Sequence, residues 1–122
     1  MDTDTITERI IGSAITVSNT VGVEFLEKVY ENALAHELRK SGLGVVQQQS
    51  LQVLYDDVGG GEYTPDLLIE GAVIVELKAA KGIDTVHEAQ LLNYLKASGV
   101  KVGLILNFGT PRFGIINKRM RM

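Results

Sequence analysis

The sequence predicts a single α/β domain in which helices flank a mixed β-sheet. Three observations predict this class. Two helical patterns come first, three strand-like segments joined by turns follow, and a last helical pattern separates two strongly apolar strands. Short turns join antiparallel strands, whereas a strand, a helix and a strand form a parallel right-handed crossover. Since 122 residues are a usual length for one domain, we expect residues 1–122 to form one.

The first half of the chain predicts two helices. Apolar residues at helical spacing cover residues 6–19, and Thr5 with Glu8 forms a capping box that would start this helix. After a break around Gly22, a second helical pattern covers residues 26–38 and ends at Gly42.

Three strands are predicted next. Apolar and polar residues alternate over residues 45–55, which is typical of a strand. Residues 56–61 include three consecutive glycines and predict a turn with an antiparallel return. The second strand would cover residues 63–69 and the third residues 72–79, with Glu70 and Gly71 turning the chain between them.

The last part predicts a helix and a strand. Asp84 or Thr85 with Glu88 would open a helix that ends at Gly99, and residues 102–107 form a strongly apolar strand. Residues 113–117 are a possible final strand. The predicted order is therefore helix, helix, strand, strand, strand, helix, strand.

Composition limits the chemistry. The chain has no cysteine and only His36 and His87, which argues against thiol chemistry, cysteine zinc sites and a histidine-rich metal site. Asp and Glu oxygens would instead suit magnesium or manganese. The net charge of −3 does not favour binding of nucleic acid by bulk electrostatics. Without a long apolar run or an export signal, we expect a cytoplasmic protein that does not contact membranes.

Two charges interrupt the apolar third strand. Glu76 and Lys78 share one face, because alternate side chains of a strand point the same way, while Leu77 faces the opposite side. Asp66, preceded by Pro65, joins them only if the turn sets the right register. A three-residue loop of residues 70–72 would place it opposite Glu76, whereas a regular two-residue loop would separate them. We predict the three-residue form or a compensating bulge.

Two adjacent carboxylates repel each other unless a cation lies between them, so Asp66 and Glu76 predict a magnesium site. Lys78 could orient a water molecule or stabilise developing negative charge, and hydrolysis of phosphodiesters fits these groups best. Two other readings stay open. Glu76 and Lys78 could lie on a solvated strand face, or form a satisfied ion pair in the core.

Helical residues add to this set. His87, Gln90 and Tyr94 form a polar stripe on the helix after the charged strand, similar to an element of helicase-associated and phage exonucleases. A solvated face is the other interpretation of this stripe. Glu27 lies at the margin of the apolar stripe of the second helix, from which it could lean toward the sheet.

The chain resembles the GxxExxY family of the PD-(D/E)XK nuclease superfamily. The similarity covers residues 22–111 and rests on residues 26–34, 61–68, 75–79, 87–95 and 106–109. It departs from the family at Glu24, where the family's naming motif opens with glycine. The resemblance implies a restriction-endonuclease-like fold.

It also implies roles for individual residues. Asp66, Glu76 and the backbone carbonyl of Leu77 would bind the metal. Lys78 would be the catalytic lysine and Glu27 an accessory acid and metal ligand, while His87, Gln90 and Tyr94 would support the substrate or the lysine.

These residues predict a nuclease that depends on Mg²⁺ or Mn²⁺ and acts on DNA, with RNA as the alternative substrate. The alternative is a non-catalytic domain that keeps the fold to bind nucleic acid or a protein. A homodimer is plausible for the nuclease, because one centre cuts only one strand.

Overall fold

The computed structural model describes residues 1–82, 85–110 and 120–121. A five-stranded sheet has the order β1-β4-β5-β6-β7, and β2 with β3 forms a separate two-stranded sheet. Only β5 and β6 are parallel among the described pairs, so the predicted mixed sheet flanked by helices is confirmed. The elements are α1 (Thr3–Val21), α2 (Glu27–Lys40), β1 (Val45–Gln47), β2 (Leu51–Tyr55), β3 (Val58–Tyr63), β4 (Leu67–Ile69), β5 (Val73–Lys78), α3 (Thr85–Ser98), β6 (Val102–Asn107) and β7 (Met120–Arg121).

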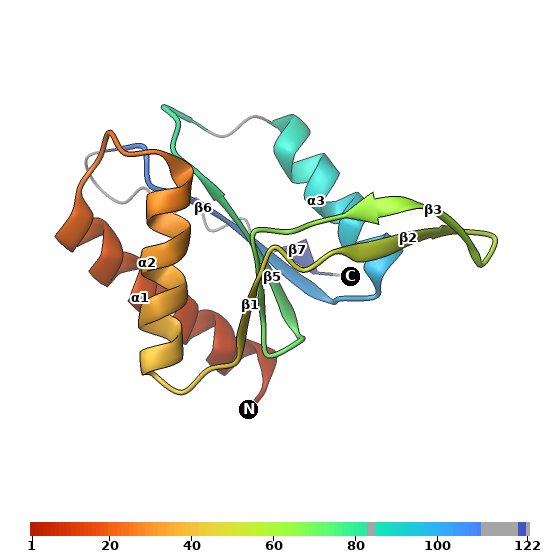
Figure 1. Ribbon diagram of the computed structural model, residues 1–122, viewed down its shortest axis with the longest axis horizontal. Coiled ribbons are helices and arrows are strands. Elements are labelled where there is room, and N and C mark those ends of the chain that lie inside the picture. The colour runs from red at the N-terminus through yellow and green to blue at the C-terminus, as the bar shows by residue number, and fades with distance from the viewer. Residues whose placement is uncertain (83–84, 111–119, 122) are drawn as a thin grey trace.

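The sheet lies between two layers (Figure 1). Val73, Val75 and Leu77 of β5 pack into the larger core cluster with buried residues of α1 and α2. Ile74 of the same strand faces the other way and packs with Leu91 of α3 in a second cluster. Glu76 and Lys78 follow Ile74 at strand spacing, so they belong to the α3 side of the sheet.

The first helix starts earlier than the predicted capping box. Asp2 is the N-cap of α1, and its carboxylate accepts the backbone N–H of Thr5 at 2.8 Å. The prediction that Thr5 and Glu8 cap the helix is therefore wrong. Asp is among the strongest N-cap residues, and with Asp2 as cap the helix begins at Thr3, three residues before the predicted start at residue 6.

Each of the first two predicted strands is split. Residues 45–55 form β1 and β2, separated by residues 48–50, of which Gln48 has a φ of 55°. The predicted strand at 63–69 contains the end of β3 and all of β4, with residues 64–66 between them. The left-handed Gln48 interrupts the first predicted strand, and Pro65 interrupts the second. The two breaks lie beside each other, since the N–H of Gln48 donates to the carbonyl of Asp66. The segment β2–β3 therefore leaves the main sheet as a hairpin.

The hairpin turn also differs from the prediction. Asp56 and Asp57 form a two-residue turn between β2 and β3, with φ values of 51° and 62°. Such a turn with two left-handed residues matches the twist of the strands that it joins. The glycines at 59–61 lie within β3 instead, so the predicted turn at 56–61 was too long.

The hairpin β4–β5 has the predicted three-residue loop. Ile69 pairs with Val73, which leaves residues 70–72 as the loop. Gly71 is left-handed with a φ of 63°, as is Glu70 with 53°. The N–H of Ala72 closes the loop by donating to the carbonyl of Ile69 at 2.9 Å. The predicted register is therefore confirmed.

Helix α3 connects β5 to the parallel strand β6. A Cβ atom on Gly103 would lie 2.9 Å from Leu91 Cδ1, so this glycine lets α3 pack closely on β6. Gly99 ends the helix with a φ of 78°, as predicted. Residue 84 and the possible strand at 113–117 lie outside the described residues. In the part of the chain that is described, no helix has the length and apolarity needed to span a membrane.

Candidate active site

Asp66 and Glu76 come together at the end of the β4–β5 hairpin. The pairing of Leu67 with Val75, extended by one residue, places Asp66 opposite Glu76. Asp66 Oδ2 accepts the backbone N–H of Leu77 at 2.8 Å, which ties the first carboxylate to the strand that carries the second. The two carboxylates are thus adjacent on one face, as the three-residue loop predicted.

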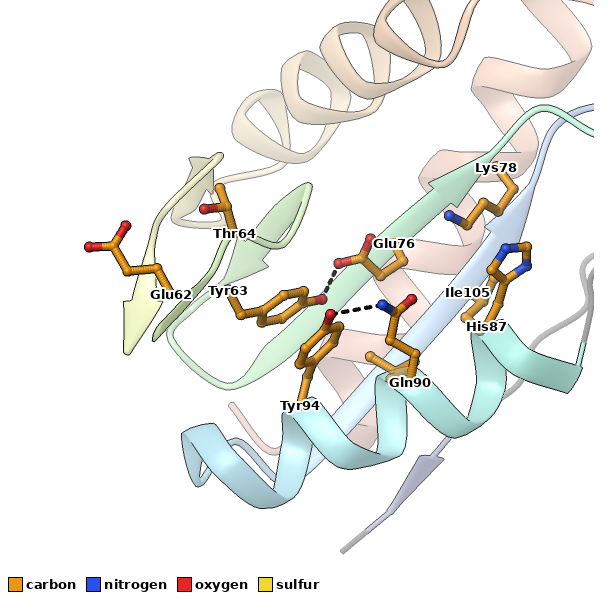
Figure 2. A pocket seen from close by; sticks show the side chains of 10 residues that line it. Glu62, Tyr63, Thr64, Glu76, Lys78, His87, Gln90, Tyr94 and Ile105 are labelled. Carbon is orange, nitrogen blue, oxygen red and sulfur yellow. Dashed lines mark hydrogen bonds between the residues drawn. The ribbon is translucent and has the colours of Figure 1, made fainter. Parts of the chain in front are cut away.

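The second carboxylate lies in a cleft of about 350 Å³ between β3, β5 and α3. Figure 2 shows Glu76 and Lys78 of β5 on one side and polar side chains of α3 facing them. The predicted residues His87, Gln90 and Tyr94 all line this cleft. The complete lining is Glu62, Tyr63, Thr64, Glu76, Lys78, His87, Gln90, Leu91, Tyr94 and Ile105.

Glu76 is a carboxyl group that changes protonation state near neutral pH. Burial, together with the negative charge of Asp66, raises the pKa of Glu76 to about 7. The hydroxyl of Tyr63 donates a hydrogen bond to Glu76 Oε1, and this bond and the charge of Lys78 act in the opposite direction. The hydroxyl of Tyr63 and the charge of Lys78 therefore offset only part of the effect of burial on the ionised form of Glu76.

Tyr63 connects Glu76 to α3 and was missed in the sequence. Its ring stacks on Tyr94 with centroids 3.5 Å apart, and the hydroxyl of Tyr94 accepts a hydrogen bond from Gln90 Nε2 at 2.8 Å (Figure 2). Burial and the charge of Glu76 raise the pKa of the Tyr63 hydroxyl, so it remains a donor. Period-two alternation gave no signal for Tyr63, because the chain bends between it and Asp66.

Lys78 and His87 supply further polar atoms in the cleft. Among the described residues, ion pairs form between Lys28 and Glu31 and between Lys40 and Glu37, and neither involves Lys78. His87 Nδ1 is buried without a hydrogen-bond partner there. Glu76 bonds to Tyr63 rather than to Lys78, so the interpretation of these charges as a satisfied core ion pair is wrong.

The acid that α2 directs toward this region is Glu31. It is only 3% exposed, whereas the predicted Glu27 is exposed at the first residue of α2. Glu31 Oε1 accepts a hydrogen bond from Gln48 Nε2 at 2.7 Å, and the same nitrogen lies 3.4 Å from Asp66 Oδ1. Its spacing of three, four and seven residues from buried Leu34, Ala35 and Leu38 was the overlooked signal.

The chemistry of the adjacent groups fits a hard divalent cation. Asp66 and Glu76 offer carboxylate oxygens, and a cation between them would relieve the repulsion that helps to raise the pKa of Glu76. Within the described ranges, no three or more acidic, histidine or cysteine side chains form a group that could hold a metal. The predicted set of Asp66, Glu76 and Glu27 is therefore not assembled, since Glu27 lies apart from the other two.

Comparison with known proteins identifies the family. No curated protein and no solved structure matches the chain. A family model described as the PD-(D/E)XK nuclease superfamily matches residues 4–119, and this match includes every residue of the site described above. The superfamily indicates nuclease activity on a nucleic-acid substrate, and its nucleases generally use divalent metals. The chain belongs to the PD-(D/E)XK nuclease superfamily.

Proposed function

We propose that this protein is a Mg²⁺- or Mn²⁺-dependent nuclease that hydrolyses phosphodiester bonds in DNA. The observation that carries the proposal is the placement of Asp66 opposite Glu76, with Lys78 two residues farther along the same strand face. Two carboxylates and an ammonium next to a polar cleft are the groups that metal-assisted phosphodiester hydrolysis needs.

Some residues of the site would bind the cation, and others would act on the phosphate or contact the substrate strand. Asp66, Glu76 and the carbonyl of Leu77 would hold the cation, which when bound lowers the pKa of a water molecule and polarises a phosphate oxygen. Lys78 stabilises the negative charge that develops on the phosphate. Gln90, Tyr94 and His87 line the opposite wall, where they would contact the substrate strand. Glu27 would act at most as an accessory group, since it is exposed.

Two narrower inferences accompany this proposal. We place the chain in the GxxExxY family within the superfamily, because several matching segments occur in the right order. We also infer a homodimer for cutting duplex DNA, since each domain presents one Asp66–Glu76 pair and one centre cuts one strand.

A nicking assay tests the proposal. Purified protein with Mg²⁺ or Mn²⁺ should cut supercoiled, linear or single-stranded DNA, and Lys78→Ala should reduce the rate about 100-fold or more. Lys101→Ala is the matched control, because Lys101 is exposed and lies outside the cleft. Wild-type protein that is inert on all DNA and RNA substrates would refute the catalytic proposal, and cutting of RNA alone would refute the choice of DNA.

The alternative is a binding domain without catalysis. It is favoured by the net charge of −3 and by the hydroxyl of Tyr63, which already occupies an oxygen of Glu76. Titration with Mn²⁺ separates the two functions. An affinity that Asp66→Ala abolishes supports the enzyme, whereas binding of nucleic acid or protein that is independent of metal supports the binding domain.

A further inference from the structure

A second hydrogen-bonded system, centred on Glu31, reaches Asp66 through Gln48. Glu31 of α2 is 3% exposed and accepts from three donors. Gln47 Nε2 donates to Oε2 at 2.7 Å, Lys28 Nζ donates to Oε2 at 2.9 Å, and Gln48 Nε2 donates to Oε1 at 2.7 Å. Burial alone raises the pKa of Glu31, but these hydrogen bonds together hold it below its ordinary value. Glu31 is therefore a fixed negative charge.

Gln48 joins this charge to Asp66 by two contacts. Its side-chain Nε2 lies 3.4 Å from Asp66 Oδ1, and its backbone N–H donates to the carbonyl of Asp66 at 3.1 Å. A primary amide has two N–H donors, so one nitrogen can serve both carboxylates. The hydrogen bond to Glu31 thus aims the amide at Asp66.

The backbone of Gln48 is held in an unfavourable conformation. Its φ of 55° lies in the left-handed region, which favours glycine, asparagine or aspartate over glutamine. Backbone strain of this kind persists where the surrounding contacts determine the geometry and often accompanies functional sites. Here the conformation breaks the strand between β1 and β2 and leaves Gln48 facing Asp66.

Asp66 is consequently oriented through both of its oxygens. Oδ2 accepts from the backbone of Leu77, and Oδ1 lies against the amide of Gln48. Each carboxylate oxygen has two lone-pair sites, so one donor on each leaves acceptor capacity free on both. Such donors fix the direction in which a carboxylate presents its remaining lone pairs.

We propose that Glu31 and Gln48 are positioning residues that orient Asp66 for metal binding. The proposal rests on the function proposed above and assigns these two residues no contact with the metal or the substrate. The negative charge of Glu31 acts only through the amide, so the effect of Gln48 on Asp66 depends on an intact Glu31.

Gln48→Gly isolates this role. Glycine accepts the left-handed backbone and removes the side chain that carries the amide, so the melting temperature of the metal-free protein should stay within a few degrees of wild type. We expect a drop of about tenfold in Mn²⁺ affinity, measured by calorimetry, and of about tenfold in kcat, with KM for DNA unchanged. Gln48→Asn provides a second variant, since asparagine also tolerates this backbone but is one methylene too short to keep both contacts.

Gln47→Ala is the matched control. Gln47 also donates to Glu31, but its amide nitrogen makes its other hydrogen bond to Asn32 Oδ1 rather than to Asp66. Its replacement should leave Mn²⁺ affinity and kcat within about twofold of wild type, whereas Glu31→Gln should reproduce the loss seen in Gln48→Gly.

The outcomes separate this inference from the function on which it rests. Wild-type affinity and kcat in both Gln48 variants overturn the positioning role and leave the proposed nuclease intact. Equal losses of Mn²⁺ affinity and kcat in Gln47→Ala and Gln48→Gly also overturn it. The losses would then not depend on the contact with Asp66, which, of the two side chains, only Gln48 makes. A wild-type protein that neither binds Mn²⁺ nor cuts DNA overturns the nuclease and the positioning role together.

Discussion

The two carboxylates of the site are adjacent, yet they are supported from different parts of the molecule. Asp66 is held by a backbone N–H of β5 and by the amide of Gln48, which a buried charge of α2 fixes in turn. Glu76 is held by the hydroxyl of Tyr63, whose ring stacks on Tyr94 of α3. One support is polar and charged, whereas the other is aromatic.

Because the two supports differ, one determines the direction of Asp66 and the other affects the ionisation of Glu76. The polar support can fix the direction of Asp66 while leaving acceptor capacity free. Burial raises the pKa of Glu76 to about 7 even though the Tyr63 hydroxyl and the charge of Lys78 act against it, so the ionised form needs further compensation. A bound divalent cation would supply that compensation, and changes on the two sides should therefore have distinguishable effects.

The largest expected effect is a loss of metal-free stability at high pH. The pKa of Glu76 in the folded protein is about 7, above the ordinary 4.5, so the folded state binds more protons between these values. The contribution of Glu76 to stability is complete below about pH 4.5 and is lost as pH rises through about 7. In EDTA, the free energy of unfolding should fall by about 3 kcal/mol from pH 4.5 to pH 8.

Glu76→Gln is the control for this prediction. Glutamine does not ionise, so urea unfolding of this variant should show a smaller decrease over the same pH range. Saturating Mg²⁺ should also reduce the decrease in wild type, because a cation stabilises the ionised carboxylate. Parallel pH profiles for the two proteins would contradict the assigned environment of Glu76.

Tyr63→Phe should give the next largest effect. The ring and its stacking on Tyr94 remain, but Glu76 loses a hydrogen bond to its charged form, worth about 1.5–3 kcal/mol. The loss should appear at pH 8 and be smaller at pH 5, where Glu76 is protonated. Tyr55→Phe is the matched control on the same hairpin, since Tyr55 is 77% exposed. Equal destabilisation at both pH values would show that the hydroxyl does not act on ionised Glu76.

The smallest effect on stability is expected for Gln90→Ala. Gln90 is exposed and donates to the hydroxyl of Tyr94, so thermal unfolding should change by less than about 0.5 kcal/mol. Because Gln90 lines the cleft, KM for DNA should rise while the pH profile of stability stays unchanged. A shift of that pH profile would instead place Gln90 in the support of Glu76.

The sequence predicted the features that depend on neighbouring residues. Alternation put Glu76 and Lys78 on one face, and the loop at 70–72 set the register that brings Asp66 opposite Glu76. The crossover from β5 through α3 to β6 followed from periodicity and turn residues. These outcomes are local, because a strand's pleat and a short turn are determined within a few residues.

Only the tertiary structure decided which distant side chains meet. The breaks at Gln48 and Pro65 detach the hairpin and bring Tyr63 to Glu76, although the strand pattern runs through both positions. The packing of α2 buries Glu31 beside Gln48 and leaves Glu27 exposed. Such contacts depend on how whole elements pack against one another, and a periodic pattern along one element does not contain that information.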